Sequence, residues 1–112
     1  MATTAPRLTT LDTACPHMRQ LVEHVTSKWG MLVLLGLDGR TLRWSELKRE
    51  IPGVSEKMLI QTLQTLEADG LVRREARPVV PPHVEYSLTT AGEEASAHLA
   101  PLALWAQARV NG

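Results

Sequence analysis

The first part of the chain carries apolar residues at helical spacing. One stripe consists of Met18, Leu21, Val22, Val25 and Trp29. A helix is expected to begin at Cys15–Pro16, because proline fits the first helical position, where its missing N–H leaves no bond unmade. Residues 28–37 are apolar on nearly every side, so a second helix is expected at the centre of the domain.

A short strand and a short helix are expected next. Residues 41–44 would form the strand and pair with a strand later in the chain. Ser45 is expected to cap the helix, since a serine hydroxyl accepts a hydrogen bond from the free N–H groups of a first turn. Leu47 and Ile51 would face inward, and Pro52–Gly53 would end the helix.

The fourth predicted helix has two chemically different faces. Ser55 would cap its start and Gly70 its end. The buried stripe is expected to consist of Met58, Leu59, Thr62, Leu63 and Leu66. The outer face is expected to consist of Glu56, Lys57, Ile60, Gln61, Gln64 and Thr65. A helix with such an outer face fits the major groove of DNA.

A β-hairpin and a last helix complete the pattern. Arg73–Arg77 would form one strand, Pro78–Pro82 the turn, and His83–Leu88 a strand with the alternation of a half-buried sheet. Thr90–Glu93 has the spacing of a capping box and would open the last helix, which Pro101 should bend or interrupt. The order of these elements predicts an α+β fold: a winged helix-turn-helix domain with flanking N- and C-terminal helices.

Composition and charge narrow the class of partner. The chain has 112 residues, 44% of them hydrophobic, which suits one globular domain. Its net charge of zero counts against non-specific nucleic-acid binding, because that affinity comes from neutralising phosphates. The charges are segregated, however: residues 73–77 hold three arginines and one glutamate, and residues 91–112 hold two glutamates and one arginine. This distribution favours DNA contact at the hairpin.

The location of the chain is inferred from missing signals. The apolar run over residues 29–37 is far too short to span a membrane, and residues 1–13 lack the pattern of a secretory signal. A single cysteine excludes an internal disulfide framework. We therefore expect no membrane partner and a cytoplasmic protein, associated with the nucleoid when bound to DNA. Residues 1–13 are expected to form a flexible tail and residues 14–110 the one domain.

The ordered motifs of the chain resemble those of HxlR-type winged helix-turn-helix transcriptional regulators. The matching segments are Cys15–Pro16, Lys28–Trp29, Leu32–Leu35, Leu42–Leu47, Ile51–Leu59, Thr62–Leu63, Leu66–Glu67, Asp69–Val72 and Pro81–Thr89. The resemblance covers roughly residues 15–107 and implies a homodimer, built from the first and last helices, that binds inverted-repeat DNA. The interface residues implied in this way are Leu21, Val25, Leu99, Leu102 and Trp105.

The candidate DNA contacts lie on the fourth helix, the hairpin and the third helix. Their side chains can bond base edges or phosphates. The candidates are Arg43, Ser45, Ser55, Lys57, Gln61, Gln64, Arg73, Arg74, Arg77 and His83. Two plainer interpretations stay open: a solvated helix face, and a surface hairpin held together by ion pairs to Glu75 and Glu85.

Cys15 is the one residue capable of redox chemistry. At a helix N-terminus the dipole favours the reactive thiolate. Some members of the family that the chain resembles sense oxidants or electrophiles such as quinones at the corresponding cysteine. Because the chain has no second cysteine, Cys15 could form only an intersubunit disulfide, a mixed disulfide or an adduct. The alternative is a small buried apolar residue at the dimer seam.

Enzyme chemistry has no support in the sequence. The four histidines and Cys15 do not form a metal-ligand spacing, so no metal and no cofactor are expected. No phosphate-binding loop or nucleophile elbow occurs. The sequence thus predicts a DNA-binding regulator in the role of repressor, with Cys15 as a candidate redox sensor. The alternatives are a regulator that responds to a small molecule, and a winged helix that binds proteins and not DNA.

Overall fold

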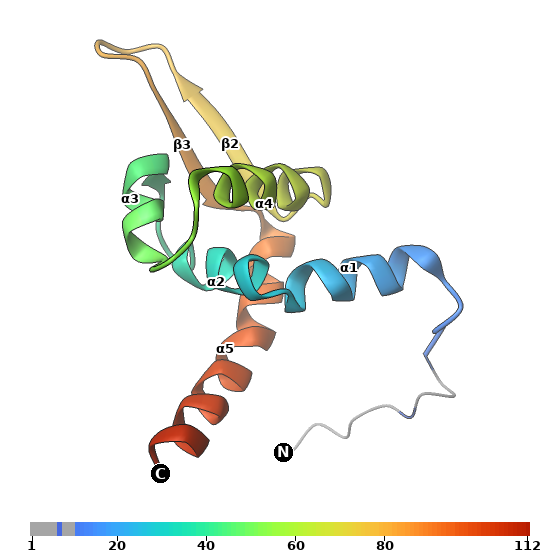
Figure 1. Cartoon of the computed structure of the whole chain (residues 1–112). Helices are drawn as coiled ribbons and strands as arrows, with labels where there is room; N and C mark the ends of the chain where they lie inside the picture. Colours follow the sequence, from blue (N-terminus) through green and yellow to red (C-terminus); the bar gives the residue numbers. More distant parts are fainter. Residues whose placement is uncertain (1–6, 8–10) are drawn as a thin grey trace.

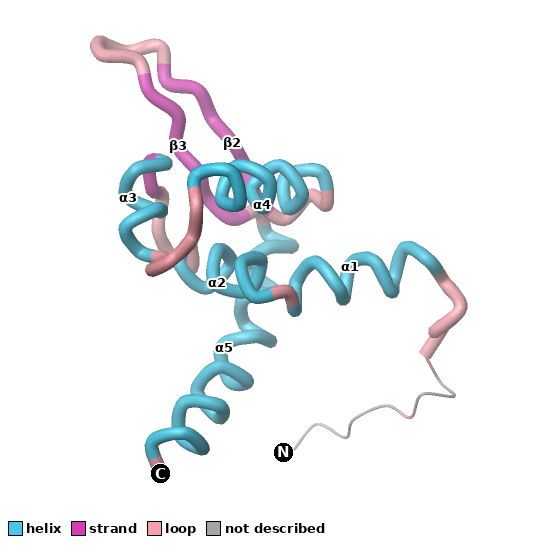
Figure 2. Tube along the Cα trace, in the orientation of Figure 1, coloured by secondary structure: helices cyan, strands magenta, loops and turns pink. Residues whose placement is uncertain are grey.

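A computed structural model describes residue 7 and residues 11–112. The tail predicted for residues 1–13 lies for the most part outside the described residues. Figures 1 and 2 show the helices and the sheet in chain order. The elements are α1 Pro16–Thr26, α2 Lys28–Gly36, β1 Leu42–Arg43, α3 Trp44–Glu50, α4 Glu56–Ala68, β2 Val72–Arg77, β3 His83–Leu88 and α5 Thr90–Asn111. This order confirms the predicted winged helix-turn-helix architecture.

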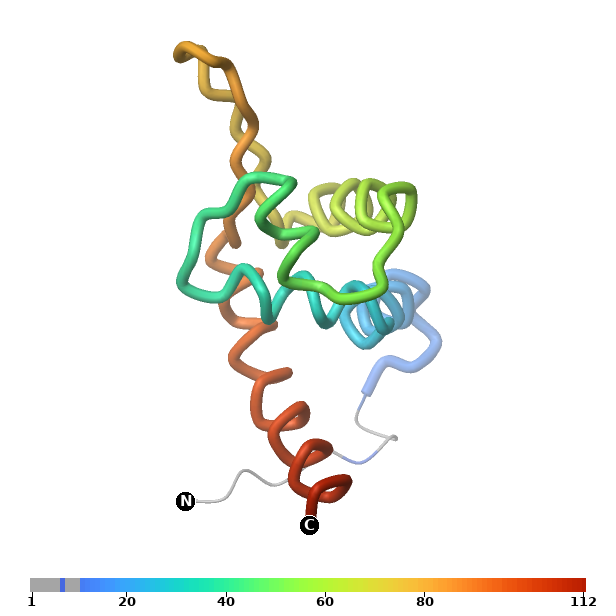
Figure 3. The backbone as a smooth tube through the Cα atoms, turned by 60° about the vertical axis from the view of Figure 1, so that its left-hand side comes forward, coloured from blue at the N-terminus to red at the C-terminus, as the bar shows by residue number. Residues whose placement is uncertain are grey.

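The apolar helix α2 lies at the centre, as predicted. Val33, Leu34 and Leu37 have no exposed surface, because α1, α4 and α5 all pack around α2. Figure 3 shows the same arrangement from a second side. The rest of the core consists of Leu42, Leu47, Ile51, Val54, Leu59, Leu63, Leu66, Leu71, Val72, Leu88 and Leu99. No helix within the described part of the chain is long and apolar enough to cross a membrane.

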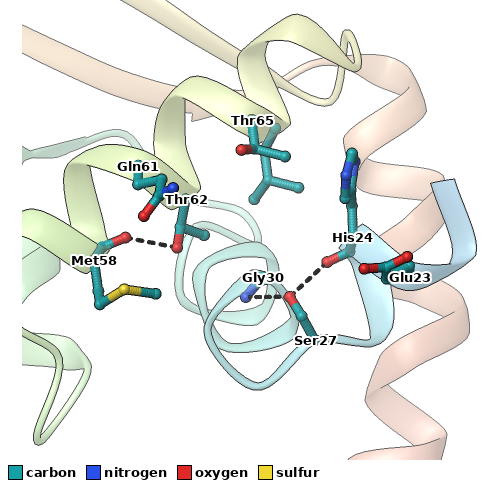
Figure 4. A pocket seen from close by; sticks show the side chains of 9 residues that line it. Glu23, His24, Ser27, Gly30, Met58, Gln61, Thr62 and Thr65 are labelled. Carbon is teal, nitrogen blue, oxygen red and sulfur yellow. Dashed lines mark hydrogen bonds between the residues drawn. The ribbon is translucent and has the colours of Figure 1, made fainter. Parts of the chain in front are cut away.

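A tight junction joins α1 to α2. Ser27 caps α2: its Oγ accepts a hydrogen bond from the Gly30 N–H at 3.2 Å and donates one to the His24 carbonyl at 2.8 Å (Figure 4). A Cβ on Gly30 would overlap that same carbonyl oxygen, so only glycine allows the approach. The close packing fixes the direction in which α1 leaves the domain.

The third helix begins two residues earlier than predicted. Arg43 is its N-cap residue and Ser45 lies inside the first turn, so the prediction that Ser45 caps the helix was wrong. The reason is the side chain of Glu46, whose Oε1 accepts a hydrogen bond from the Arg43 N–H at 2.8 Å. Strand β1 ends at Arg43, which leaves no room for another cap residue.

The fourth helix starts and ends as predicted. Ser55 Oγ accepts a hydrogen bond from the Met58 N–H at 3.1 Å. At the other end Asp69 is the C-cap residue, and Gly70, directly after it, stops the helix with a φ of 77°, the left-handed conformation that glycine adopts at low cost. Leu59, Leu63 and Leu66 are buried, but Met58 is 37% exposed, so its place in the predicted buried stripe was wrong. Met58 lies at the flank of this stripe and faces the α1–α2 junction (Figure 4).

The three strands form one antiparallel sheet in the order β1-β3-β2. In the long hairpin Val72 pairs with Leu88 and Arg77 pairs with His83. The base of the hairpin is buried through Val72 and Leu88, whereas residues 73–82 are exposed. The hairpin therefore projects from the helices as a wing, away from the C-terminal end of α5 (Figures 1 and 3).

The last helix differs from its prediction in two ways. Thr89, not Thr90, is its N-cap residue, and Thr89 Oγ1 accepts a hydrogen bond from the Gly92 N–H at 3.1 Å. The helix also continues past Pro101 to Asn111, so the expected interruption does not occur, while a bend at Pro101 stays a prediction. Proline removes the bond to the carbonyl of Ala97, but Ala97 is exposed, so water can satisfy that carbonyl.

Candidate nucleic-acid interface

The outer face of α4 presents three long polar side chains to solvent. Lys57, Gln61 and Gln64 are all exposed and follow one another at intervals of four and three residues, so they lie on one face. Together with Ile60 they line a shallow hollow on the helix surface. At about 1.5 Å of rise per residue this face is about 10 Å long, close to three base-pair steps of DNA.

Ile60 is a residue of this face that sequence reasoning did not select as a contact. Its side chain is 47% exposed in the middle of the polar row. It also borders a second hollow, between α4 and the wing, whose lining includes Gln64 of α4, Arg74 of β2 and Tyr86 of β3. A signal was present in the sequence: an aliphatic residue stands alone among polar ones on an outward face.

Two arginines at the base of the wing are available for a partner. Arg73 and Arg74 are exposed, and neither forms an ion pair with the described residues. Arg74 lies opposite Tyr86 in the sheet and beside the outer face of α4, since both line the hollow between helix and wing. The structure thus brings Gln64 of the helix and Arg74 of the wing to one surface.

Arg77 and His83 are held within the wing itself. Arg77 Nη1 lies 3.0 Å from Glu75 Oε1, and Arg77 Nε donates a hydrogen bond to Glu85 Oε1 at 2.9 Å. His83 Nε2 lies 3.1 Å from Glu85 Oε2. The hydrogen bonds from Arg77 first, and then from His83, lower the pKa of the Glu85 carboxyl. The ion-paired interpretation of the hairpin therefore holds at its outer half.

The remaining candidates lie at the edges of this surface. Ser55 is exposed at the N-terminus of α4, where unpaired N–H groups favour an anion. Arg43 and Ser45 are exposed at the junction of β1 and α3. Because β3 lies between β1 and β2, Arg43 is on the opposite edge of the sheet from Arg73 and Arg74.

The first and last helices carry uncovered apolar side chains. No residue of α1 is buried by the described part of the chain, and Leu21 is 43% exposed. In the second half of α5, Leu102 is 48% exposed and Trp105 is 62% exposed. The two other expected interface residues differ: Val25 is half-buried against the core, and Leu99 belongs to the core of its own chain.

Cys15 lies at the start of α1, which is on another side of the molecule from the wing (Figure 1). It is the N-cap residue of α1, half-exposed, and its own side chain makes no cap hydrogen bond. Among the described residues there is no group of three histidine, cysteine or acidic side chains that could hold a metal ion. What the geometry brings together is a surface of hydrogen-bonding and cationic groups, suited to binding.

Comparison with known proteins places this surface in a family. A model described as HxlR-like helix-turn-helix matches residues 24–112. The HTH-type transcriptional regulator YtfH of Escherichia coli K12 is 58% identical over 91 residues, which are 81% of this chain and 71% of that protein.

Solved structures agree with the match. A structure of the transcriptional regulator YtfH from Salmonella typhimurium aligns with a TM-score of 0.79 and 52% identity, covering 87% of this chain and 86% of that one. The redox regulator HypR in its oxidised form aligns with a TM-score of 0.76 and 32% identity, covering 84% and 96%. All three proteins are described as regulators and not as enzymes. The chain belongs to the HxlR-like helix-turn-helix family and is a transcriptional regulator with a helix-turn-helix DNA-binding fold.

Proposed function

We propose that the chain acts as a homodimer that binds an inverted-repeat operator and represses transcription. Each subunit would place the outer face of α4 in a major groove and its wing along the adjacent backbone. The two-fold axis of the dimer would then match the symmetry of the operator. Repression follows where the operator overlaps a promoter, because the bound dimer excludes polymerase.

One observation carries the DNA-binding part of this proposal. The exposed amide of Gln64 lines the same hollow as the exposed guanidinium of Arg74, which has no ion pair within the described chain, and Lys57 and Gln61 continue the same face of α4. Amide and ammonium groups can bond base edges, and a guanidinium can bond phosphate. The net charge of the whole chain is zero, but Arg73 and Arg74 at the base of the wing are exposed and form no ion pair with the described residues.

The proposed dimer is supported by apolar surface that the described chain leaves uncovered. α1 buries none of its residues, although an apolar stripe runs along it. The second half of α5 extends beyond the core with Leu102, Leu104 and Trp105 exposed. Helices with such faces are stable when a second copy covers them. Leu21, Leu102 and Trp105 would contact the partner directly, while Val25 and Leu99 would support that surface from behind.

Mutation of the wing tests DNA binding. Purified protein would be titrated onto a fluorescent duplex from its own upstream region and onto a scrambled duplex, at several salt concentrations. Replacing Arg73 and Arg74 with alanine should weaken binding and reduce the slope of log K against log salt by about one for each phosphate that is no longer neutralised. Arg109→Ala, at the far end of α5, is the matched control. Should every variant bind both duplexes alike, the DNA-binding proposal fails and a protein-binding role takes its place.

Cys15 would make the dimer responsive to oxidants. Two Cys15 thiolates, one from each subunit, lose two electrons to an oxidant such as diamide, which takes up two protons and becomes a hydrazine. One intersubunit disulfide results. This disulfide at the start of α1 would move the two subunits relative to each other. The spacing of the two α4 helices would change with them. The similarity to HypR, which is described as a redox regulator, supports this part of the proposal.

The Cys15→Ser protein separates thiol sensing from the alternative. Diamide should weaken operator binding by the wild-type protein and leave the variant unaffected, and non-reducing electrophoresis should show a dimer only for the wild type. A variant that still responds to its inducer favours a small-molecule effector. The structure offers a place for one: a hollow between α1 and α4, lined among others by Glu23, Gln61 and Thr65 (Figure 4).

A further inference from the structure

We propose that Ile60 determines operator specificity by contacting the C5-methyl group of a thymine in each half-site. The inference rests on the DNA-binding function proposed above and names a chemical feature of the operator. Thymine is the base that presents a methyl group in the major groove, and aliphatic side chains distinguish it by apolar contact.

The exposure of Ile60 has no explanation within its own chain. The side chain of Ile60 is 47% exposed, whereas Leu59 and Leu63 on the same helix are only 0% and 2% exposed. Ile60 is not part of the buried core. A β-branched residue also lowers helix propensity slightly at a surface position. Contact with a partner that has an apolar group of methyl size would account for both features.

The neighbours of Ile60 identify that partner as DNA. Lys57, Gln61 and Gln64 surround it on the outer face of α4 and share its hollow. On the other side, the hollow between α4 and the wing adds the guanidinium of Arg74. The surroundings of Ile60 are mainly polar: they hold the two cations of Lys57 and Arg74 and one carboxylate, that of Glu67, so a protein partner would find a single exposed aliphatic side chain among them. A DNA duplex offers phosphates to the guanidinium of Arg74, base edges to the polar side chains of α4, and a methyl group to Ile60.

The geometry also limits which bases can be involved. Ile60 lies one position before Gln61, and their side chains project from adjacent positions of the same face. Glutamine can form two hydrogen bonds to the N6 and N7 atoms of adenine. An A·T pair at this place would give its adenine edge to Gln61, while the methyl of its own thymine, or of the next one, would meet Ile60. The half-site should therefore contain at least one required thymine near its centre.

Thymine-to-uracil substitution isolates this contact. The operator is first selected with the full chain from a pool of randomised duplexes. Each thymine of the half-site is then replaced by deoxyuridine, which removes only the methyl group, and affinity is measured by fluorescence anisotropy. At one position the wild-type protein should lose about fourfold in affinity, the value for one buried methyl-sized group. Ile60→Ala should bind the thymine duplex more weakly and show no further loss with uracil.

Met58 provides the control substitution. Met58→Ala removes another exposed apolar residue of the same helix, on the flank facing α1, and should keep the full sensitivity to uracil. The inference is overturned if uracil leaves wild-type binding unchanged at every thymine, or if Ile60→Ala loses as much as the wild type. If the selection yields no sequence bound above a scrambled duplex, the proposed function itself fails, and the thymine contact fails with it.

Discussion

The imidazole of His24 and the carboxylate of Asp69 join the end of α1 to the end of α4, with His24 Nδ1 lying 2.7 Å from Asp69 Oδ2. Asp69 is the C-cap residue of α4, where the helix dipole makes a negative charge unfavourable. A hydrogen bond from Nδ1–H to the carboxylate offsets this effect. The two side chains are only 24% and 18% exposed, so water competes weakly for them.

We predict that this bond ties the position of α4 to α1. In a double-mutant cycle with His24→Ala and Asp69→Ala, the coupling in the free energy of unfolding should be about 1–2 kcal/mol. The measurement is urea denaturation of the two single variants and the double variant. Asp69→Asn is a useful control, because its amide oxygen can still accept the bond. Additive single effects would show that the contact contributes nothing to stability.

The bond between His24 and Asp69 could not be predicted from the sequence. His24 and Asp69 are 45 positions apart, and no periodicity connects two polar residues at such a distance. Caps and stripes were predictable because they depend on neighbours within one turn, as at Ser55. The helix starts shifted by two residues at Ser45 and by one at Thr90, because several nearby residues could serve as the cap and competing side chains such as Glu46 decide between them.

Burial was predicted well along the centre of each stripe and poorly at its edges. Leu59 and Leu63 lie at the middle of the α4 stripe and are buried, but Met58 at its edge is exposed. The edge depends on how close the neighbouring helices come, which a single-helix pattern does not contain. The same limit applies to the site: exposed polar residues were identifiable, yet the pairing of Arg77 with Glu85 required the strand register.

A second prediction concerns the contact between α5 and the loop before β2. A Cβ on Gly92 would overlap the carbonyl oxygen of Leu71, which already accepts a hydrogen bond from the Thr89 N–H at 3.0 Å. Gly92→Ala should therefore lower the free energy of unfolding by about 1–3 kcal/mol, despite the better helix propensity of alanine. Thermal denaturation followed by circular dichroism measures the change.

Gly36 provides the matched control for this substitution. It is also a helical glycine, but the nearest atom to its added Cβ would be Leu47 Cδ1 at 3.5 Å, an ordinary contact. Gly36→Ala should be neutral or stabilise by up to about 1 kcal/mol. Equal losses at both glycines would argue against the overlap at Leu71 as the cause.

A third prediction follows from an unpaired hydroxyl in the core. Ser96 is 1% exposed, and its Oγ has no hydrogen-bond partner among the described residues. Ser96→Ala removes this polar group with almost no change in volume and should stabilise the protein by about 1 kcal/mol. Ser55→Ala, which removes a bonded cap, should destabilise by a similar amount. A loss of stability in Ser96→Ala would indicate that Oγ has a partner in the assembled protein, and the dimer would be the place to look.

The last prediction concerns the wing at low pH. The hydrogen bonds from Arg77 and then His83 hold the pKa of Glu85 below its ordinary value of 4.5. A carboxyl whose pKa is lowered in the folded state contributes stability above its unfolded pKa, and this contribution is lost as pH falls through the folded pKa. The outer half of the hairpin should therefore loosen only below the range in which an ordinary glutamate titrates.

NMR titration of the Glu85 side-chain carbonyl measures its pKa directly. Arg77→Gln should raise this pKa toward 4.5, because the variant lacks the strongest donor to the carboxylate. Arg73→Gln, which removes an arginine without an ion pair in the described chain, should leave the pKa of Glu85 in place. A wild-type value at or above 4.5 would show that Arg77 is free in solution and available to phosphate, which would return it to the set of DNA contacts.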